Sequence, residues 1–250
     1  MTVRGYVICS YPRSGTNYLC QLLASTGNLG NPQDWFNGPG IRARLDAEYP
    51  LEPEAQVPQA RRRGSTENGV YGMKMFSASF ERLAGYDWAS ALPGLRWVHL
   101  ERHDLLGQAI SDVRSTQTQQ FRSTAKAVAE PRFDHTAIHE ALARAVRDQA
   151  RWKFYFARNA ISPVQLTYEA ILEAPQDAVD TIERLVNLGQ TSKIRMEHVT
   201  LEIQRDGITE EWRRRFLSIE RGLAKLTTVP SPAVLRTRRR LEHLCHRIAG

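Results

Sequence analysis

The segment "VICSYPRSGTNYLCQLL", Val7 to Leu23, constrains the fold more than any other part of the sequence. Its apolar residues predict a short buried strand over Val7–Ser10, and a turn of small residues joins that strand to a helix predicted over Thr16–Thr26. A strand, a tight turn and a helix in this order are typical of α/β proteins, where free amides at the helix N-terminus favour an anion. We therefore expect an anion site at the carboxyl end of the first strand.

Short apolar strands alternate with helical patterns along the rest of the chain. The further predicted strands cover Val70–Phe76, Leu95–Leu100 and Val164–Thr167. The further predicted helices cover Leu105–Thr118, His135–Ala160, Gln176–Leu188 and the basic segment from Glu210 onward. Residues 41–68 are rich in charge and predict an irregular, mobile segment. The alternation indicates one α/β domain over residues 1–250, with a central parallel sheet and helices on both faces.

The composition narrows the choice of partner without selecting one. The 250-residue chain carries a formal net charge of +7, which favours anionic partners such as nucleotides, nucleic acid, acidic sugars or a membrane surface. Its three cysteines lack the CxxC spacing of zinc sites. The sequence predicts neither a signal peptide nor a membrane span, so we expect a cytoplasmic protein.

The loop in "SYPRSGTNYL" supplies the candidate residues of the anion site. Gly15 lets the backbone approach a ligand closely, and Ser14, Thr16 and Asn17 lie at or near the helix N-terminus. Arg13 adds a charged fork that suits an oxyanion. A plain N-capped helix after a turn explains these residues equally well. The Walker pattern GxxxxGK[ST] does not occur in this loop, which argues against ordinary ATP or GTP chemistry.

The segment "LERHDLLGQAIS" is a second candidate for binding a phosphate. It places Arg102 at the end of the third strand and Ser111 on the helix that follows. Their side chains converge on one phosphate only if the connecting turn folds back. Arg102 could equally pair with Asp104, so the spacing alone does not decide between the two interpretations.

Together these segments resemble the sulfotransferases that use 3′-phosphoadenosine 5′-phosphosulfate (PAPS), and most of all the bacterial trehalose 2-sulfotransferase family. "SYPRSGTNYL" resembles their 5′-phosphosulfate loop, and "ERHDLLGQAIS" resembles their 3′-phosphate motif. "GVYGMKMF" is similar to the strand that brings a lysine, here Lys74, to the reaction centre, and "TYEAI" to the segment whose tyrosine, here Tyr168, approaches the adenosine. The similarity runs from about residue 6 to residue 216 and implies a P-loop-like PAPS-binding fold.

The resemblance also implies roles in transferring a sulfonate group to an acceptor hydroxyl. Asp34 is the candidate general base, in a loop where the family usually has a glutamate. Trp35 and Phe36 are expected to be exposed and to offer apolar faces to a sugar or ring. Lys74 is expected to reach the bridging oxygen or the sulfonate. Arg205, in "QRDG", is expected to close over the nucleotide, and no metal is expected.

Structural roles explain some of the same residues without any reaction. Asp34 also fits an Asx turn in a Pro-rich loop, and Lys74 also fits a strand residue whose stem is buried while its charge reaches water. His99, on the third strand, fits core packing better than catalysis.

Two other functions remain open from the sequence. A P-loop-like kinase of a small alcohol would need Mg²⁺ and ATP, and a nucleic-acid-binding protein would use the basic residues Arg236 and Arg238–Arg240. No recognised nucleic-acid motif supports the latter, so we expect no nucleic-acid partner. Trehalose, another sugar and a hydroxylated secondary metabolite all remain possible acceptors. Because dimers are common in the family, the resemblance also allows a homodimer.

Overall fold

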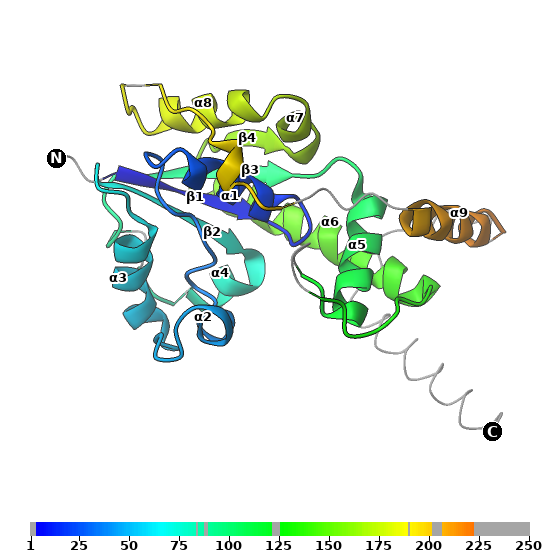
Figure 1. Ribbon diagram of the computed structural model, residues 1–250. Helices are drawn as coiled ribbons and strands as arrows, with labels where there is room; N and C mark the ends of the chain where they lie inside the picture. Colours follow the sequence, from blue (N-terminus) through cyan, green and yellow to red (C-terminus); the bar gives the residue numbers. More distant parts are fainter. Residues whose placement is uncertain are drawn as a thin grey trace.

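A four-stranded parallel sheet organises the protein, with strand order β2-β1-β3-β4. The computed structural model describes residues 4–83, 85–87, 90–121, 126–189, 191–201 and 207–222. The strands are β1 (Arg4–Ser10), β2 (Val70–Phe76), β3 (Leu95–Glu101) and β4 (Val164–Thr167). Figure 1 shows β1 in the interior of the sheet, with helices above and below it. The predicted α/β class, with a parallel sheet and helices on both faces, is confirmed.

The register aligns the carboxyl ends of three strands at one edge of the sheet. Ser10, at the end of β1, pairs with Phe76 of β2 on one side and with Leu100 of β3 on the other. The chain leaves each strand at this edge and enters a loop or a helix. Side chains just beyond the strand ends therefore lie near one another, although they come from distant parts of the sequence.

Alternating residues of β1 enter two separate cores. Val7 and Cys9 join an apolar cluster with α2 (Gly38–Arg44), α3 (Pro53–Gly64), α4 (Ser77–Leu83) and α6 (His135–Arg158). Tyr6 and Ile8 join a second cluster with α1 (Thr16–Ser25), α7 (Tyr168–Glu173) and α8 (Pro175–Leu185). Successive strand side chains point to opposite faces, so a continuous apolar strand such as β1 requires helices on both.

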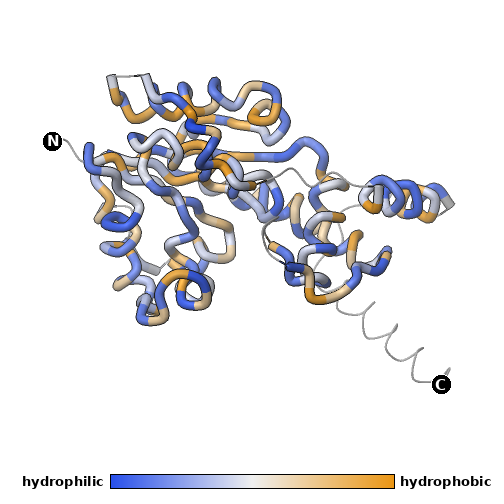
Figure 2. Tube along the Cα trace, in the orientation of Figure 1, coloured by the Kyte–Doolittle hydropathy of each residue, from blue (hydrophilic) through white to orange (hydrophobic). Residues whose placement is uncertain are grey.

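A third apolar cluster lies beside the sheet. It packs α5 (Leu105–Thr118) against α6 and against α9 (Gly207–Gly222), with Trp212 and Phe216 of α9 buried. Figure 1 shows α9 extending away from the sheet at the end of α5. In Figure 2 the helices alternate between hydrophilic and hydrophobic colours along their length, as amphipathic helices do. The 3₁₀ turn η1 (Met196–His198) follows α8.

The prediction that residues 41–68 are irregular is wrong. This segment contains the end of α2 and the whole of α3, whose buried residues are Gln56, Val57, Ala60 and Gly64. Three consecutive arginines and an internal proline, Pro58, weaken the apolar periodicity that would have indicated a helix. No helix within the described ranges is long and apolar enough to cross a membrane.

Candidate active site

The loop between β1 and α1 adopts the backbone that its sequence suggested. Gly15 has φ 80°, in the left-handed region that favours glycine, and Arg13 has φ 64°. The Ser14 hydroxyl donates to the Tyr11 carbonyl oxygen at 2.8 Å, so this side chain holds the loop together. Gly15 is the N-cap of α1, and no side chain caps the helix there. The first amides of α1 therefore lack the side-chain acceptor that Asp104 provides for α5 and Asp134 for α6.

Tyr168 packs directly against this loop. A methyl group on Gly15 would lie 2.3 Å from Cδ2 of the Tyr168 ring, which leaves no space for any larger residue. The guanidinium of Arg102 lies 4.8 Å from the centre of the same ring, within the range of a cation–π contact. The structure thus brings together Gly15, Arg102 and Tyr168, which the sequence placed in three separate motifs.

The segment that follows β3 also fastens the loop. Nε of Arg13 donates to the Ser111 hydroxyl at 2.9 Å, and Nη1 of Arg102 lies 3.4 Å from the Arg13 carbonyl oxygen. Gln108, which sequence reasoning missed, is fully buried and donates from Nε2 to the Pro12 carbonyl oxygen at 2.9 Å. The two expected phosphate-binding segments are therefore one connected structure, with the turn after Arg102 folded back as convergence requires.

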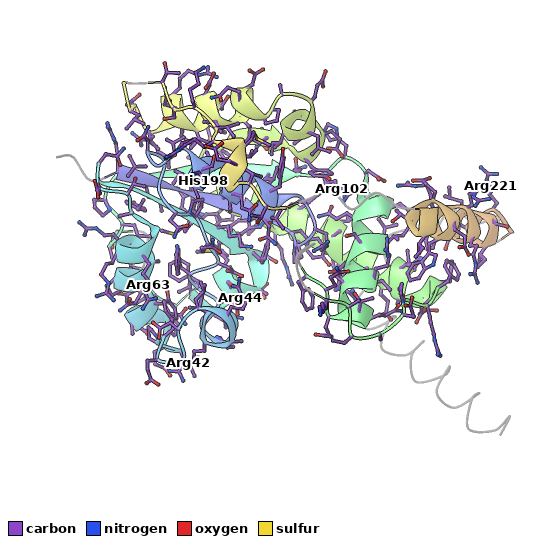
Figure 3. All side chains as sticks on the ribbon, in the orientation of Figure 1. Arg42, Arg44, Arg63, Arg102, His198 and Arg221 are labelled. Carbon is purple, nitrogen blue, oxygen red and sulfur yellow. The ribbon has the colours of Figure 1, made fainter. Side chains whose placement is uncertain are left out.

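A cavity of about 640 Å³ lies beside this connected structure. Arg13, Arg102, Ser111 and Tyr168 contribute to its wall. Figure 3 shows Arg102 where the chain passes from β3 to α5. The Nε atom of Arg102 is buried and has no hydrogen-bond partner among the described residues. Burial also lowers the pKa of the Arg13 guanidinium, an effect that the nearby Asp112 opposes. A buried guanidinium group is stabilised when an anion binds beside it.

Two further arginines of the cavity were not identified from the sequence. Arg114 lies one turn after Ser111 on α5 and donates from Nη1 to Thr209 Oγ1 at 2.7 Å. Arg213, on α9, donates from Nη2 to Asp104 Oδ2 at 2.6 Å. Arg114 follows Ser111 by three residues on a predicted helix, which puts both side chains on the same face, so this spacing could have identified Arg114. Arg213 occurs in the run "RRRF", which resembles a solvated charged face, so nothing in the local sequence indicated that Arg213 lines a cavity.

Lys74 and Asp34 lie together on the other side of the β1 loop. Met73 of β2 forms a parallel bridge with Gln33, and the Lys74 amide donates to the Gln33 carbonyl oxygen at 2.9 Å. This pairing of Gln33 with β2 holds the next residue, Asp34, close to Lys74. The Lys74 Nζ atom donates to Asn17 Oδ1 at 2.5 Å, which connects β2 to the first turn of α1.

The environment of Asp34 changes the pKa of its carboxyl group. Asp34 is 5% exposed, and its Oδ1 atom has no hydrogen-bond partner among the described residues. Burial raises the pKa above its ordinary value, although the charge of Lys74 and a hydrogen bond with Asn37 act in the opposite direction. A carboxylate with a raised pKa accepts a proton more readily than an exposed one, which is what a general base requires.

The expectation that Trp35 and Phe36 are exposed is wrong. Their side chains are 3% and 2% exposed and belong to the cluster beneath β1 and β2. Trp35 donates from Nε1 to the Asn31 carbonyl oxygen at 3.1 Å, and its ring stacks with Tyr49 of the following segment. The core formed by α2 and α3 takes up both rings, because residues 41–68 are folded over them. They offer no open face to a sugar in this structure.

Not every predicted residue can be placed. Arg205 lies outside the described residues, as do the basic residues Arg236 and Arg238–Arg240. Thr16 is 4% exposed at the start of α1, and the predicted core residue His99 is fully buried. The described arrangement provides cations and free helix amides on one flank of the β1 loop, and a carboxylate beside an ammonium group on the other.

Comparison with known proteins assigns the chain to a family of enzymes. Residues 5–218 match the model of the Stf0 sulphotransferase family, so the chain belongs to this family and is a sulfotransferase. The trehalose 2-sulfotransferase of Mycobacterium tuberculosis (strain ATCC 35801 / TMC 107 / Erdman) is 28% identical over 259 residues, covering 86% of this chain and 94% of that protein. The trehalose 2-sulfotransferase of Mycolicibacterium smegmatis (strain ATCC 700084 / mc(2)155) is 24% identical over 254 residues, covering 84% and 93%.

Among solved structures, a similar one is the sulfotransferase domain from the curacin biosynthetic pathway. It has a TM-score of 0.43 and 15% sequence identity, and the match covers 87% of this chain and 99% of that domain.

Proposed function

We propose that this sulfotransferase moves a sulfonate group from PAPS to a hydroxyl group of a sugar or a sugar-containing small molecule. The observation that carries the proposal is the buried Nε atom of Arg102, which has no partner among the described residues and belongs to a cavity wall with three other arginines. The uncapped N-terminus of α1 supports it, since its free amides and the helix dipole favour a phosphate.

The donor set fits a nucleotide that carries two phosphate groups. Arg13 and the amides that follow Gly15 suit the 5′ side of the donor, and Arg102 with Ser111 suits a 3′-phosphate. Tyr168 offers an aromatic ring to the adenosine beside both groups. PAPS supplies an activated sulfonate on a phosphate leaving group. The residues of this flank bind and orient it, and they supply positive charge where negative charge develops.

On the other flank, Asp34 takes the proton of the acceptor hydroxyl and Lys74 supports the negative charge that forms near the sulfonate. Their proximity to the β1 loop, through Gln33 and Asn17, supports this division of roles. The sugar acceptor rests on the names of the two relatives, both trehalose 2-sulfotransferases. A small-alcohol kinase finds no such support, because the loop lacks the lysine of the Walker pattern.

Ligand binding to an Arg102→Ala variant tests the donor. We expect calorimetry to show a large loss of affinity for 3′-phosphoadenosine 5′-phosphate and a small loss for adenosine 5′-phosphosulfate, which lacks the 3′-phosphate. A charge-assisted hydrogen bond contributes about 1.5–3 kcal/mol, so the first loss should be roughly tenfold or more. Arg96→Ala, an exposed arginine of the same strand, is the matched control.

Equal losses for both ligands would show that Arg102 does not read the 3′-phosphate. Thermal stabilisation of the parent protein by ATP–Mg²⁺ or duplex DNA, but not by 3′-phosphoadenosine 5′-phosphate, would contradict the proposed donor altogether.

A further inference from the structure

The cavity contains its own anion, the carboxylate of Asp104. We propose that Asp104 is an internal counterion which competes with the 3′-phosphate of the donor nucleotide for Arg102 and Arg213, and so sets the affinity of the site for that nucleotide. This inference rests on the proposed function and concerns a residue to which the sequence motifs assigned no role beyond a possible pairing with Arg102.

The two oxygens of Asp104 have separate partners. Oδ1 accepts the Gly107 amide at 2.9 Å and caps the N-terminus of α5. Oδ2 accepts from Nη2 of Arg213 at 2.6 Å, and Nη2 of Arg102 lies 3.4 Å from it. Burial raises the pKa of this carboxyl group, but the hydrogen bonds from Arg213 and Gly107 outweigh burial and place the pKa below its ordinary value. Asp104 is therefore a charged carboxylate at neutral pH.

The position of Asp104 makes it a competitor of a bound phosphate. Asp104, Arg102 and Arg213 all line the same cavity. A 3′-phosphate that engages Arg102 meets a carboxylate already directed at that guanidinium, and like charges at such short range repel each other. The ion pair between Asp104 and Arg213 must also weaken or rearrange before Arg213 can reach the nucleotide. The contacts with Asp104 therefore reduce the net attraction of both arginines for a bound phosphate.

The other carboxylates of the cavity wall, Glu130, Glu169 and Glu210, are poorer candidates for this role, and Glu130 is exposed to solvent. Glu169 accepts backbone amides, those of His103 at 3.2 Å and Asp104 at 3.3 Å. Glu210 lies 3.7 Å from Nε of Arg213, and its side chain is 69% exposed, so water screens its charge. Only Asp104, among the described carboxylates of the cavity wall, contacts both Arg102 and Arg213.

A competing carboxylate has a consequence for turnover. The product nucleotide keeps its 3′-phosphate after the sulfonate has left, so the arginines that hold the donor also hold the product. A counterion that takes over Arg102 and Arg213 as the nucleotide departs lowers the barrier to release, a step that limits many enzymes.

The separate use of the two oxygens allows a clean substitution. Asp104→Asn keeps an oxygen acceptor for the Gly107 amide and removes the charge, and asparagine caps a helix as well as aspartate does. Asp104→Ser, another good N-cap, is the second variant. Asp134→Asn is the matched control, because Asp134 caps α6 through the Ala137 amide at 2.9 Å and is not part of the cavity wall.

Calorimetry on the full chain, at one fixed ionic strength, measures the effect. The probes are 3′-phosphoadenosine 5′-phosphate and adenosine 5′-phosphate, with circular dichroism melting of each variant as the check on folding. We expect Asp104→Asn and Asp104→Ser to bind the 3′-phosphorylated probe about tenfold more tightly than the parent does, with a much smaller change for adenosine 5′-phosphate. Asp134→Asn should bind both probes as the parent does.

The outcomes separate this inference from the proposed function. If folded Asp104 variants bind the 3′-phosphorylated probe with unchanged or weaker affinity, Asp104 is a positioning group for the arginines and the inference is overturned, while nucleotide binding by the parent still supports the proposed function. If the parent itself does not bind the 3′-phosphorylated probe, the proposed function fails first, and the inference fails with it.

Discussion

Asp34 and Lys74 are opposite charges in a region with little access to water, with side chains 5% and 6% exposed. Burying a charged carboxylate costs free energy that a neighbouring ammonium group only partly offsets, which is why the pKa of Asp34 remains raised. The charged form of Asp34 therefore lowers the free energy of unfolding relative to its protonated form. At the residue scale, the role of Asp34 can therefore be tested through activity and stability together.

Asp34→Asn should lower the turnover rate by about 10² to 10⁴ and leave the affinity for 3′-phosphoadenosine 5′-phosphate unchanged. Its stability should change in the opposite sense. Because the folded pKa of Asp34 is raised, its contribution to the parent's stability is present below the ordinary value of 3.8 and is lost as pH rises through the folded pKa. Asp34→Asn has no carboxyl group to titrate at this position. Its unfolding free energy relative to that of the parent should therefore increase as pH rises through the folded pKa of Asp34.

Steady-state kinetics with saturating acceptor and chemical denaturation at several pH values check both parts. Asp87→Asn, at an exposed position, is the control. Turnover near the parent rate would reduce Asp34 to a loop residue, whatever its effect on stability.

Lys74→Met should lower turnover and barely change nucleotide affinity, because under the proposed function the ammonium group acts on charge that develops during the transfer. Lys74 also lowers the pKa of Asp34, so its removal should move the acid limb of the pH–rate profile to higher pH. The profile of turnover against pH measures both effects. Lys153→Met, which removes an exposed ion pair with Glu101, is the control. An acid limb that stays in place would mean that Lys74 and Asp34 do not interact as described.

At the scale of elements, the turn from β1 to α1 depends on a single residue without a side chain. Gly15→Ala adds a methyl group 2.3 Å from the Tyr168 ring at a φ of 80°. We expect a loss of roughly 1–3 kcal/mol in unfolding free energy and a strong loss of nucleotide binding, because the ring and the loop must separate. Denaturation and calorimetry measure the two losses.

Gly189→Ala provides a matched control for backbone strain. Gly189 has φ 73°, and an added methyl group meets nothing within 4 Å. It should lose stability from the backbone alone and keep its nucleotide affinity. Combining Gly15→Ala with Tyr168→Ala should restore part of the stability but not the binding. If Gly15→Ala behaves like Gly189→Ala in both measurements, the contact with Tyr168 has no role in the site.

The strands were easier to predict from the sequence than α2 and α3. The predicted β2, Val70–Phe76, agrees with the structure, because a buried parallel strand is a short apolar run between turn residues. In contrast, α3 buries a narrow stripe and carries three consecutive arginines, so its local sequence resembles a solvated loop. Missing α3 also caused the error about Trp35 and Phe36, because the residues that cover them come from the segment expected to be irregular.

In the candidate site, too, contacts between residues far apart in the sequence could not be predicted. Arg13, Arg102, Ser111 and Tyr168 could be predicted, since each belongs to a local motif at the end of a strand. The ion pair between Arg213 and Asp104 joins residues 109 positions apart, and packing of α9 against α5 brings them together. Local spacing carries no information about such a contact.

At the scale of the whole molecule, the buried imidazole of His99 should make stability depend on pH. Burial lowers the pKa of His99 below its ordinary value of 6.5, although Glu101 opposes this effect. The unfolded chain therefore binds a proton in a pH range where the folded chain does not. Stability is fully present above about pH 6.5 and is lost as pH falls through the folded pKa.

His99→Leu should flatten the decline of unfolding free energy as pH falls below about 6.5, as measured by chemical denaturation at several pH values. His198→Gln, at an exposed histidine, should retain the parent's decline. An equal decline in the His99 variant and the parent would assign the pH dependence to other groups.

The central position of β1 separates two tasks that the chain must perform. Arg102, Ser111 and Tyr168 lie on the flank of β3 and β4, whereas Lys74 and Asp34 lie on the flank of β2, and Figure 3 shows Arg42, Arg44 and Arg63 on the latter side, away from Arg102. Under the proposed function, the first flank binds the donor and the second binds the acceptor. Substitutions on the β2 flank can then change the acceptor without altering the residues that bind the donor.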